Sequence, residues 1–368
     1  MKESMQKVRE LEKQLFGYSY AMRVIDFDSE TIAPEDGNDG RAEAMEFLSR
    51  QSFDLLVNDR TAALLKAAAA DAETEQEQAE VRNLQREYDE IAKIPAAEYA
   101  AFTKLCQQSI PAWTKAKRTN DFSIFAPYLE KIVAARRAQA AYFDPDRDPY
   151  EVFLDRYERG LTIAQCDAFF AQLRETIVPL LAEIQKRGAP IRTDFLDQEW
   201  SIDAQKKVSE KIMQLWGMDP KRSMLAESEH PFTTEFWRKD VRITTHYMPR
   251  DMFSNLYSVA HEGGHALYEL NINPDYDYTS VTGGATMGLH ESQSRLFENI
   301  VGRSRAFVEY LYPTLKELFP QQLADVSAEE IWRAVNRAEP SLIRTEADEL
   351  TYALHIMVRY ELEKAMMQ

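Results

Sequence analysis

The stretch SVAHEGGHALYEL, residues 258–270, decides what the rest of the chain has to support. Apolar residues recur in it at helical spacing, yet Gly263 and Gly264 stand side by side in its middle. Each glycine in a helix interior costs about 0.8–1 kcal/mol relative to alanine. We therefore predict a helix whose glycines allow another backbone to approach closely, that of the following glycine-rich loop or of the helix after it.

Two histidines flank these glycines in the pattern H-E-x-x-H. His261 and His265 lie one helical turn apart, so both imidazoles leave the same face and converge on one ion. Zinc binds imidazole nitrogen at about 2.0–2.1 Å, which suits this spacing. Glu262 is rotated by about 100° from His261 and faces the open side of the ion. The pattern predicts a catalytic zinc with two histidine ligands and Glu262 as the general base.

A third ligand has to come from outside this helix. Glu269 is one turn beyond His265, but a straight helix runs tangent to the ion, so Glu269 cannot complete a tetrahedron. After the glycine-rich loop SVTGGATMG (280–288), a second helix is expected near residue 289, and it carries Glu291 and Glu298. We favour Glu291 as the ligand. Glu298 is either a rival ligand or the hydrogen-bond partner of a ligating imidazole.

The histidines are unevenly distributed along the chain. All six lie after residue 229, and five of them fall between His230 and His290. This shift in composition indicates a histidine-dependent site in the last third of the sequence. His355 stands alone on an expected helix face and is predicted to be structural, whereas the sequence leaves the role of His246 open.

The rest of the chain has mainly helical patterns. The first 229 residues read as successive amphipathic helices, as in residues 61–94. The alternating, β-branched segment DVRITTHY (240–247) is the best strand candidate. Ser327 provides a helix-capping signal, and residues 341–368 are predicted to form one long amphipathic helix. Proline, glycine and aspartate mark breaks between helices at 33–40, 143–150 and 186–194.

Composition excludes several classes of protein. The chain has 368 residues, 45% of them hydrophobic, and a net charge of −17, which argues against nucleic acid as a partner. No run of 18 apolar residues occurs, and the amino terminus has no apolar signal region, so we expect neither a membrane span nor secretion. Cys106 and Cys166 are too far apart in sequence to suggest a thiolate metal site or a disulfide framework. We expect a globular cytoplasmic protein.

Five short segments then appear in a fixed order, and together they resemble the carboxypeptidase Taq family, also called thermostable carboxypeptidase 1. A segment near the amino terminus, FDSETIAPEDGNDGRAE (27–43), is also similar to the family. H-E-x-x-H alone is shared by many families, whereas the ordered set is specific. The five segments are HPF (230–232), DVRIT (240–244), HEGGH (261–265), HESQS (290–294) and IRTEAD (343–348).

The resemblance implies a mainly α, multi-helix, zincin-type metallopeptidase with a small β-sheet near the active-site cleft. It implies an enzyme that removes single residues from the carboxyl ends of peptides with broad specificity, using zinc or sometimes cobalt, and that forms a homodimer. It also implies His261, His265 and Glu291 as metal ligands and Glu262 as the base.

An exopeptidase of this kind must recognise a terminal carboxylate, and a bidentate arginine is suited to that task. Arg344 in IRTEAD is the first candidate. Its alternative role is an ion pair with Glu346 or Asp348. Arg242 and His230 are further candidates for substrate binding, although Arg242 could instead form a cross-strand structural pair.

Members of the family are longer and carry a later motif, G-x-x-Q-D-x-H-W, which this sequence lacks. We therefore expect one helical metallopeptidase domain over 1–368, incomplete at its carboxyl end, with 1–229 forming one cleft wall and 230–368 carrying the metal site. Two alternatives remain open from the sequence. One is a thimet-type oligopeptidase that cuts within short peptides, and the other is a truncated zinc-binding helical protein without activity.

Overall fold

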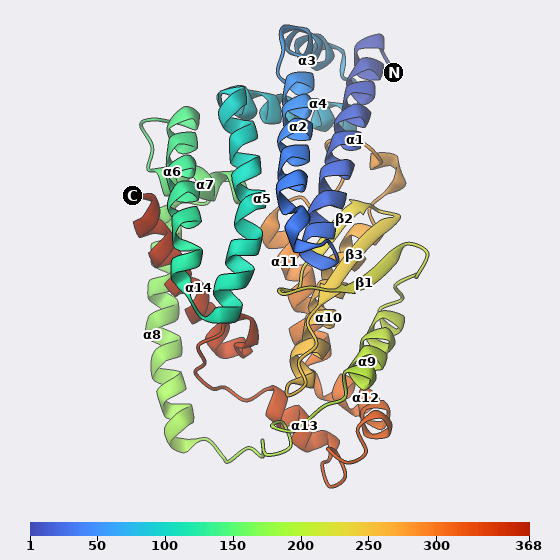
Figure 1. Cartoon of the computed structure of the whole chain (residues 1–368), viewed down its shortest axis with the longest axis vertical. Coiled ribbons are helices and arrows are strands. Elements are labelled where there is room, and N and C mark those ends of the chain that lie inside the picture. Colours follow the sequence, from blue (N-terminus) through green and yellow to red (C-terminus); the bar gives the residue numbers. More distant parts are fainter.

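Helices make up most of the computed structural model, which describes all 368 residues (Figure 1). The prediction of a mainly helical fold with a small sheet is confirmed. None of the helices combines the length and the hydropathy that crossing a bilayer requires. The α-helices are α1 (Glu3–Thr31), α2 (Asn38–Leu56), α3 (Asp59–Asp71), α4 (Glu75–Ile91), α5 (Ala96–Thr119), α6 (Ala126–Phe143), α7 (Pro149–Tyr157), α8 (Ile163–Arg187), α9 (Ile202–Leu215), α10 (Met252–Leu270), α11 (Met287–Arg295), α12 (Arg305–Leu318), α13 (Ala328–Val335) and α14 (Glu349–Met367).

Many helix ends follow local sequence signals. Thr74 and Glu77 form a capping box at the start of α4, in which each side chain accepts a hydrogen bond from the other residue's backbone N–H. Ser327 and Glu330 do the same for α13, as the capping signal predicted. The three breaks predicted from proline, glycine and aspartate coincide with the ends of α1, α6 and α8.

The long helix predicted over 341–368 is wrong in its first third. The helix α14 begins only at Glu349, and a short 3-10 turn, η5 (Arg344–Glu346), precedes it. Asp348 has an extended backbone, and its carboxylate accepts hydrogen bonds from the backbone N–H groups of Leu350 and Thr351. An aspartate in this conformation starts a helix rather than continuing one, so the IRTEAD segment lies in a loop.

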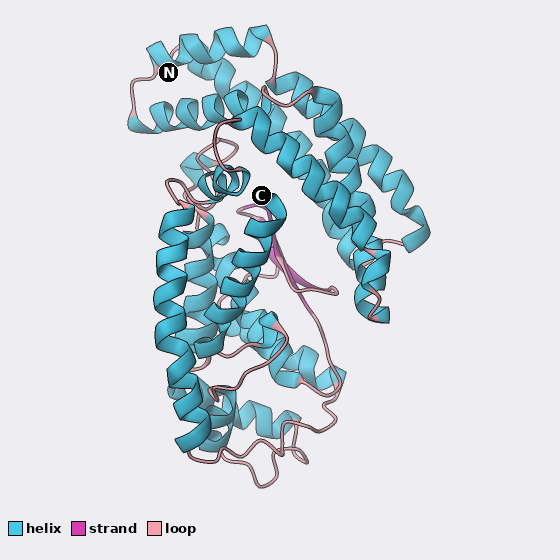
Figure 2. Cartoon of the chain, turned by 90° about the vertical axis from the view of Figure 1, so that its left-hand side faces the viewer, coloured by secondary structure: helices cyan, strands magenta, loops and turns pink.

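Three short strands form one mixed sheet in the order β1-β3-β2. The strand predicted at 240–247 is present as β3 (Asp240–Thr245), in the centre of the sheet. It pairs in parallel with β1 (Ser223–Glu227) and antiparallel with β2 (Thr233–Trp237). The strands lie in the middle of the molecule with helices on both sides (Figure 2).

One face of this sheet carries the helix that contains H-E-x-x-H. Val241 and Ile243 of β3 are fully buried in the largest hydrophobic core, which also includes side chains of α9, α10, α12 and α13. Thirteen of the 19 residues of α10 are buried. The helix is therefore fixed inside the core, and its two histidines project from a rigid support.

The other face of the sheet is covered by α1. Phe27 of α1 makes edge contacts with Phe232 and Phe236, at ring-centroid distances of 5.8 and 6.0 Å. The hydroxyl of Tyr20 donates a 2.6 Å hydrogen bond to Asp240 at the start of β3. The first helix of the chain thus packs directly against the sheet that supports the metal-bearing segment.

The loop between α10 and α11 is also tied to the amino-terminal helices, at Ser280. Its backbone N–H donates to Glu12 of α1 at 2.8 Å, and its hydroxyl donates to the carbonyl of Glu80 in α4 at 2.8 Å. Its carbonyl accepts from the amide of Asn83 at 3.0 Å. Every polar group of Ser280 is therefore used to hold the start of the glycine-rich loop.

The buried carboxyl of Glu12 makes the stability of these Ser280 contacts depend on pH. Burial raises the pKa of Glu12 to about 7 from 4.5, although the hydrogen bonds from Ser280 oppose the shift. Because the folded pKa is the higher one, the free energy of unfolding falls as the pH rises from about 4.5 to about 7. Glu12→Gln keeps an oxygen acceptor for Ser280 and should remove this fall, which is on the order of 3 kcal/mol.

Urea unfolding of both proteins at pH 5 and pH 8 measures the effect. Glu10→Gln is the matched control, because Glu10 is exposed on the same helix. The control should keep the pH dependence of the parent protein. An unchanged pH dependence in Glu12→Gln would contradict the assignment.

Candidate metal centre and active site

The two histidines of H-E-x-x-H lie on one face of α10, a turn apart. The helix is started by Asp251, whose side chain accepts a 3.0 Å hydrogen bond from the backbone N–H of Ser254. The rings of His261 and His265 are nearly perpendicular, at an interplanar angle of 80° and a centroid distance of 5.0 Å. Their Nε2 atoms both face Glu291, which comes from α11.

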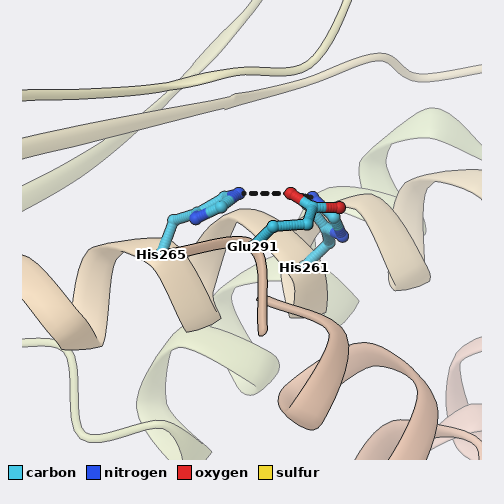
Figure 3. A group of neighbouring side chains, drawn as sticks. All are labelled: His261, His265 and Glu291. Atoms are coloured by element: carbon cyan, nitrogen blue, oxygen red, sulfur yellow. Dashed lines mark ion pairs between the residues drawn. The ribbon is translucent and has the colours of Figure 1, made fainter. Parts of the chain in front are cut away.

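Glu291 completes a group that has the geometry of a metal site. Its Oε2 is 3.3 Å from Nε2 of His265 and 3.8 Å from Nε2 of His261. One ligand atom from each residue lies within 4.8 Å of the others, and Figure 3 shows the three side chains pointing toward one another. Two atoms that share a tetrahedral zinc lie about 3.3 Å apart, which the pair of His265 and Glu291 matches and the pair of His261 and Glu291 approaches. The three ligand roles remain a prediction.

The carboxylate of Glu291 is in the charge state that a ligand needs. Burial alone would raise its pKa, but the nearby groups of His265, His261 and Arg295 outweigh burial. Together they lower the pKa of Glu291 to about 2. An ionised carboxylate beside two imidazoles is a donor set that zinc prefers in catalytic sites.

Glu262 lies beside this group but is held by the sheet. Its Oε2 accepts a 2.6 Å hydrogen bond from the hydroxyl of Thr233 in β2. Burial raises the pKa of Glu262, while the neighbouring His261 opposes the shift. One carboxylate oxygen is fixed by Thr233, a residue that directly follows the HPF segment and that no sequence signal distinguished.

Glu298 lies on the far side of His261. Its Oε2 is 2.8 Å from Nδ1 of His261, the ring nitrogen that does not face Glu291. Arg295 and Arg303 both donate to the carboxylate of Glu298. Of the two glutamates weighed from the sequence, the structure thus brings Glu291 into the ligand group and places Glu298 as a hydrogen-bond partner of an imidazole.

The segment that carries Glu298 is wider than an α-helix. It forms a π-helix, η4 (Leu296–Gly302), directly after α11. Such turns contain one extra residue per turn and often occur at functional sites. No local sequence signal predicted it, because its position depends on how α11 packs against α10.

Arg344 is connected to the site through Tyr352. Its Nη1 donates a 2.9 Å hydrogen bond to the hydroxyl of Tyr352 in α14. The guanidinium of Arg295 stacks on the ring of Tyr352 at 3.7 Å, and its Nε donates to Glu291 at 3.0 Å. Arg295 and Tyr352 were not predicted from the sequence, since nothing local distinguishes them from other surface residues.

The other two substrate-binding candidates have different surroundings. Arg242 donates two 2.8 Å hydrogen bonds to Asp240 of the same strand and stacks on Phe236. Its guanidinium is thus engaged in a structural pair, but within one strand and not across two strands, as the alternative from the sequence had it. His230 is exposed, and partial desolvation together with the positive charge of Arg344 lowers its pKa. Both arginine assignments for substrate remain predictions.

The two glycines of the opening stretch make room for different neighbours. A Cβ atom on Gly264 would lie 2.7 Å from the carbonyl oxygen of Gln293 and from Cα of Ser294, both in α11. A Cβ atom on Gly263 would instead meet the indole of Trp216 at 2.6 Å. The predicted close approach of a second backbone is confirmed for Gly264, whereas Gly263 accommodates a side chain.

Gly264→Ala should therefore push α11 away from α10. We expect a loss of stability of about 1–3 kcal/mol despite the better helix propensity of alanine, together with weaker metal binding because Glu291 moves. Thermal unfolding and zinc titration measure the two effects. Gly17→Ala is the matched control, because Gly17 lies within α1 with nothing within 4 Å of the added carbon. The control should be as stable as the parent or more so, and an equally stable Gly264→Ala would contradict the steric argument.

The helical fold and the convergent His-His-Glu group define the class of a helical metallopeptidase. The family model described as carboxypeptidase Taq (M32) metallopeptidase matches residues 7–368, and the chain belongs to this family. Carboxypeptidase 1 of Bacillus subtilis is 38% identical over 359 residues, which cover 97% of this chain and 72% of that protein. Thermostable carboxypeptidase 1 of Pyrococcus furiosus is 36% identical over 361 residues, covering 96% and 71%.

Solved structures agree with this assignment. The crystal structure of BsuCP superposes with a TM-score of 0.97 at 38% identity, over 100% of this chain and 74% of that chain. The family resemblance inferred from the five segments is confirmed. The chain is an enzyme of the metallocarboxypeptidase class, and this class depends on a divalent metal. The alternative of a thimet-type oligopeptidase is not supported.

Proposed function

We propose that the enzyme removes single residues from the carboxyl ends of peptides, with zinc held by His261, His265 and Glu291 and with Glu262 as the general base. The observation that carries this proposal is the convergence of the three donors within 4.8 Å, with Glu262 beside them and anchored by Thr233. When bound, a zinc ion would polarise the scissile carbonyl and lower the pKa of a water molecule toward 7. Cobalt is the alternative ion.

In this mechanism Glu262 moves one proton twice. Its carboxylate accepts a proton from the attacking water and then delivers it to the amine of the departing residue. Thr233 donates to Oε2 and so leaves the other oxygen of Glu262 available for this transfer. Burial of Glu262 excludes bulk water from the proton path.

Recognition of the substrate carboxylate is assigned to the cationic groups around His230. Arg344 is the first candidate, because a guanidinium can donate two parallel hydrogen bonds to a carboxylate. Lys117 and Arg359 add positive charge near His230, and Arg344 contributes to the same potential. Side-chain selectivity is proposed to be broad.

The proposal also includes the organisation and setting of the enzyme. We propose one domain over 1–368, in which 1–229 forms one wall of the cleft and 230–368 carries the metal site. We propose a cytoplasmic homodimer that does not bind nucleic acid. The net charge of −17 supports the last of these points, because binding to phosphates requires concentrated positive charge.

A defined peptide with a free carboxyl end tests the activity. After incubation with the zinc-loaded enzyme, mass spectrometry should show a ladder that shortens by one residue at a time from the carboxyl end. The same peptide with an amidated end should be cleaved at least about 100-fold more slowly, because it lacks the charge-assisted hydrogen bonds.

Three other outcomes would contradict parts of the proposal. Internal fragments would indicate an oligopeptidase, and an intact peptide would indicate a metal-binding protein without activity. Equal cleavage of the free and amidated peptides would show that the terminal carboxylate is not recognised.

A further inference from the structure

Two side chains beside the proposed ligands are not used by the mechanism, namely His290 and Glu269. Nδ1 of His290 is 2.6 Å from Nδ1 of His265. Nε2 of His290 is 2.8 Å from Oε1 of Glu269, whose side chain is 6% exposed. Glu269, His290 and His265 therefore form a line of hydrogen-bonding groups that ends at a proposed ligand.

The direction of these hydrogen bonds follows from the ligand role of His265. Its Nε2 faces Glu291 and must be free of a proton to bind an ion, so a neutral His265 carries its proton on Nδ1. Nδ1–H of His265 then donates to Nδ1 of His290. His290 in turn carries its own proton on Nε2 and donates it to Glu269. A reversed line would place a proton on Nε2 of His265 and block the ion.

Glu269 is the reason why the line has only one favourable direction. An ionised carboxylate accepts hydrogen bonds but cannot donate them. Its only hydrogen-bond partner in the structure is His290, and a buried carboxylate without a partner is costly. Glu269 therefore requires a proton on Nε2 of His290, and Nδ1 of His290 is an acceptor whenever the ring holds only that one proton.

The glycine-rich loop holds His290 in position for this contact. A Cβ atom on Gly284 would lie 2.5 Å from Cδ2 of His290, so the loop backbone lies against the imidazole. The ring of Tyr268 packs edge-on at a centroid distance of 5.0 Å. The loop backbone and α10 thus lie on two sides of the His290 ring, which limits its rotation away from His265.

We propose that His290 and Glu269 are positioning residues that keep His265 in the tautomer and orientation that bind the ion. This inference rests on the proposed role of His265 as a ligand. The two imidazoles would then be supported differently: His261 by the carboxylate of Glu298 directly, and His265 by a second imidazole placed between it and a carboxylate.

Three substitutions at His290 separate positioning from simple packing. His290→Asn places an amide oxygen where Nδ1 was and keeps an acceptor for His265. His290→Gln places its amide where Nε2 was, so it keeps the contact with Glu269 but loses the acceptor. His290→Leu keeps the approximate volume and loses both contacts.

Zinc affinity of the metal-free protein, measured by competition with a chromophoric chelator, is the readout. We expect about 10–100-fold weaker binding in His290→Leu and His290→Gln, the usual cost of losing such a partner, and binding within about threefold of the parent in His290→Asn. Glu269→Ala should give a smaller loss than His290→Leu, because the contact between the two imidazoles remains. His355→Leu, which removes a histidine that makes no hydrogen bond, should not change the affinity.

Thermal unfolding of the metal-free variants shows whether packing explains the result. Positioning predicts that affinity follows the presence of the acceptor and not the unfolding temperature. Binding within threefold of the parent in His290→Leu, or binding as weak as that of His290→Leu in His290→Asn, would overturn the inference.

Glu291→Ala in the same titration distinguishes the two levels of the argument. If it binds zinc as tightly as the parent does, the metal site itself is wrongly assigned and the proposed function fails along with this inference. If Glu291→Ala loses zinc while His290→Leu retains full affinity, the metal site stands and only the positioning role is overturned.

Discussion

Zinc binding at one ion per chain is expected to be lost in Glu291→Ala. This variant removes the donor that joins α11 to the two histidines of α10, and a catalytic zinc site needs three protein ligands. Two imidazoles on one helix remain, and they should bind zinc too weakly to survive gel filtration. The metal content of the purified protein, measured by mass spectrometry, checks this result.

Two further glutamates make the test specific to Glu291. Glu298→Gln should weaken zinc binding without abolishing it, because Glu298 contacts the outer nitrogen of His261. Glu317→Ala changes an exposed residue of α12 and should have no effect. Loss of zinc in Glu298→Gln together with its retention in Glu291→Ala would reverse the ligand assignment.

Loss of turnover without loss of metal is the second large effect, and Glu262→Gln should show it. The amide retains an oxygen and similar volume, so it can still accept from Thr233, but it cannot take a proton from water. We expect kcat/KM on a peptide with a free carboxyl end to fall by about 100- to 10,000-fold, with one zinc ion per chain as in the parent.

Zinc analysis and peptide cleavage on the same preparation separate the roles of base and ligand. Glu317→Gln serves as the control for replacing a glutamate by its amide. Activity of Glu262→Gln within tenfold of the parent would show that another group takes the proton, and loss of its zinc would show a structural role instead.

The parts of the site that are local in sequence could be predicted from it. The helical period of 258–270 fixes His261 and His265 on one face, and the spacing of four residues needs no knowledge of the remaining fold. The strand at 240–247 was also predictable, because its β-branched residues alternate. The two neighbouring strands were not, since SMLAE and TTEFW are short and mix helix and strand formers.

The parts that depend on packing were accessible only in part. Which of Glu291 and Glu298 lies near the Nε2 atoms of both histidines depends on how α11 packs across Gly264, and the glycine indicated only that another backbone comes close. The predicted start of α14 was too early because Ile343 continues the apolar pattern of the helix. In the structure the carboxylate of Asp348 caps the first turn, so α14 begins only at Glu349. Thr233 and His290 make their contacts with residues of other elements, and such contacts leave no periodic signal in the sequence.

The π-helical turn after α11 has a consequence for insertions and deletions. Glu291 and Glu298 are seven positions apart, about two turns of helix, and they reach opposite nitrogens of the same ring of His261. Removing or adding one residue between them would rotate Glu298 by about 100° relative to Glu291. Substitutions on the outer surface of this segment should therefore be tolerated. Insertions or deletions between Glu291 and Glu298 should not be, because both carboxylates have to reach the imidazole of His261.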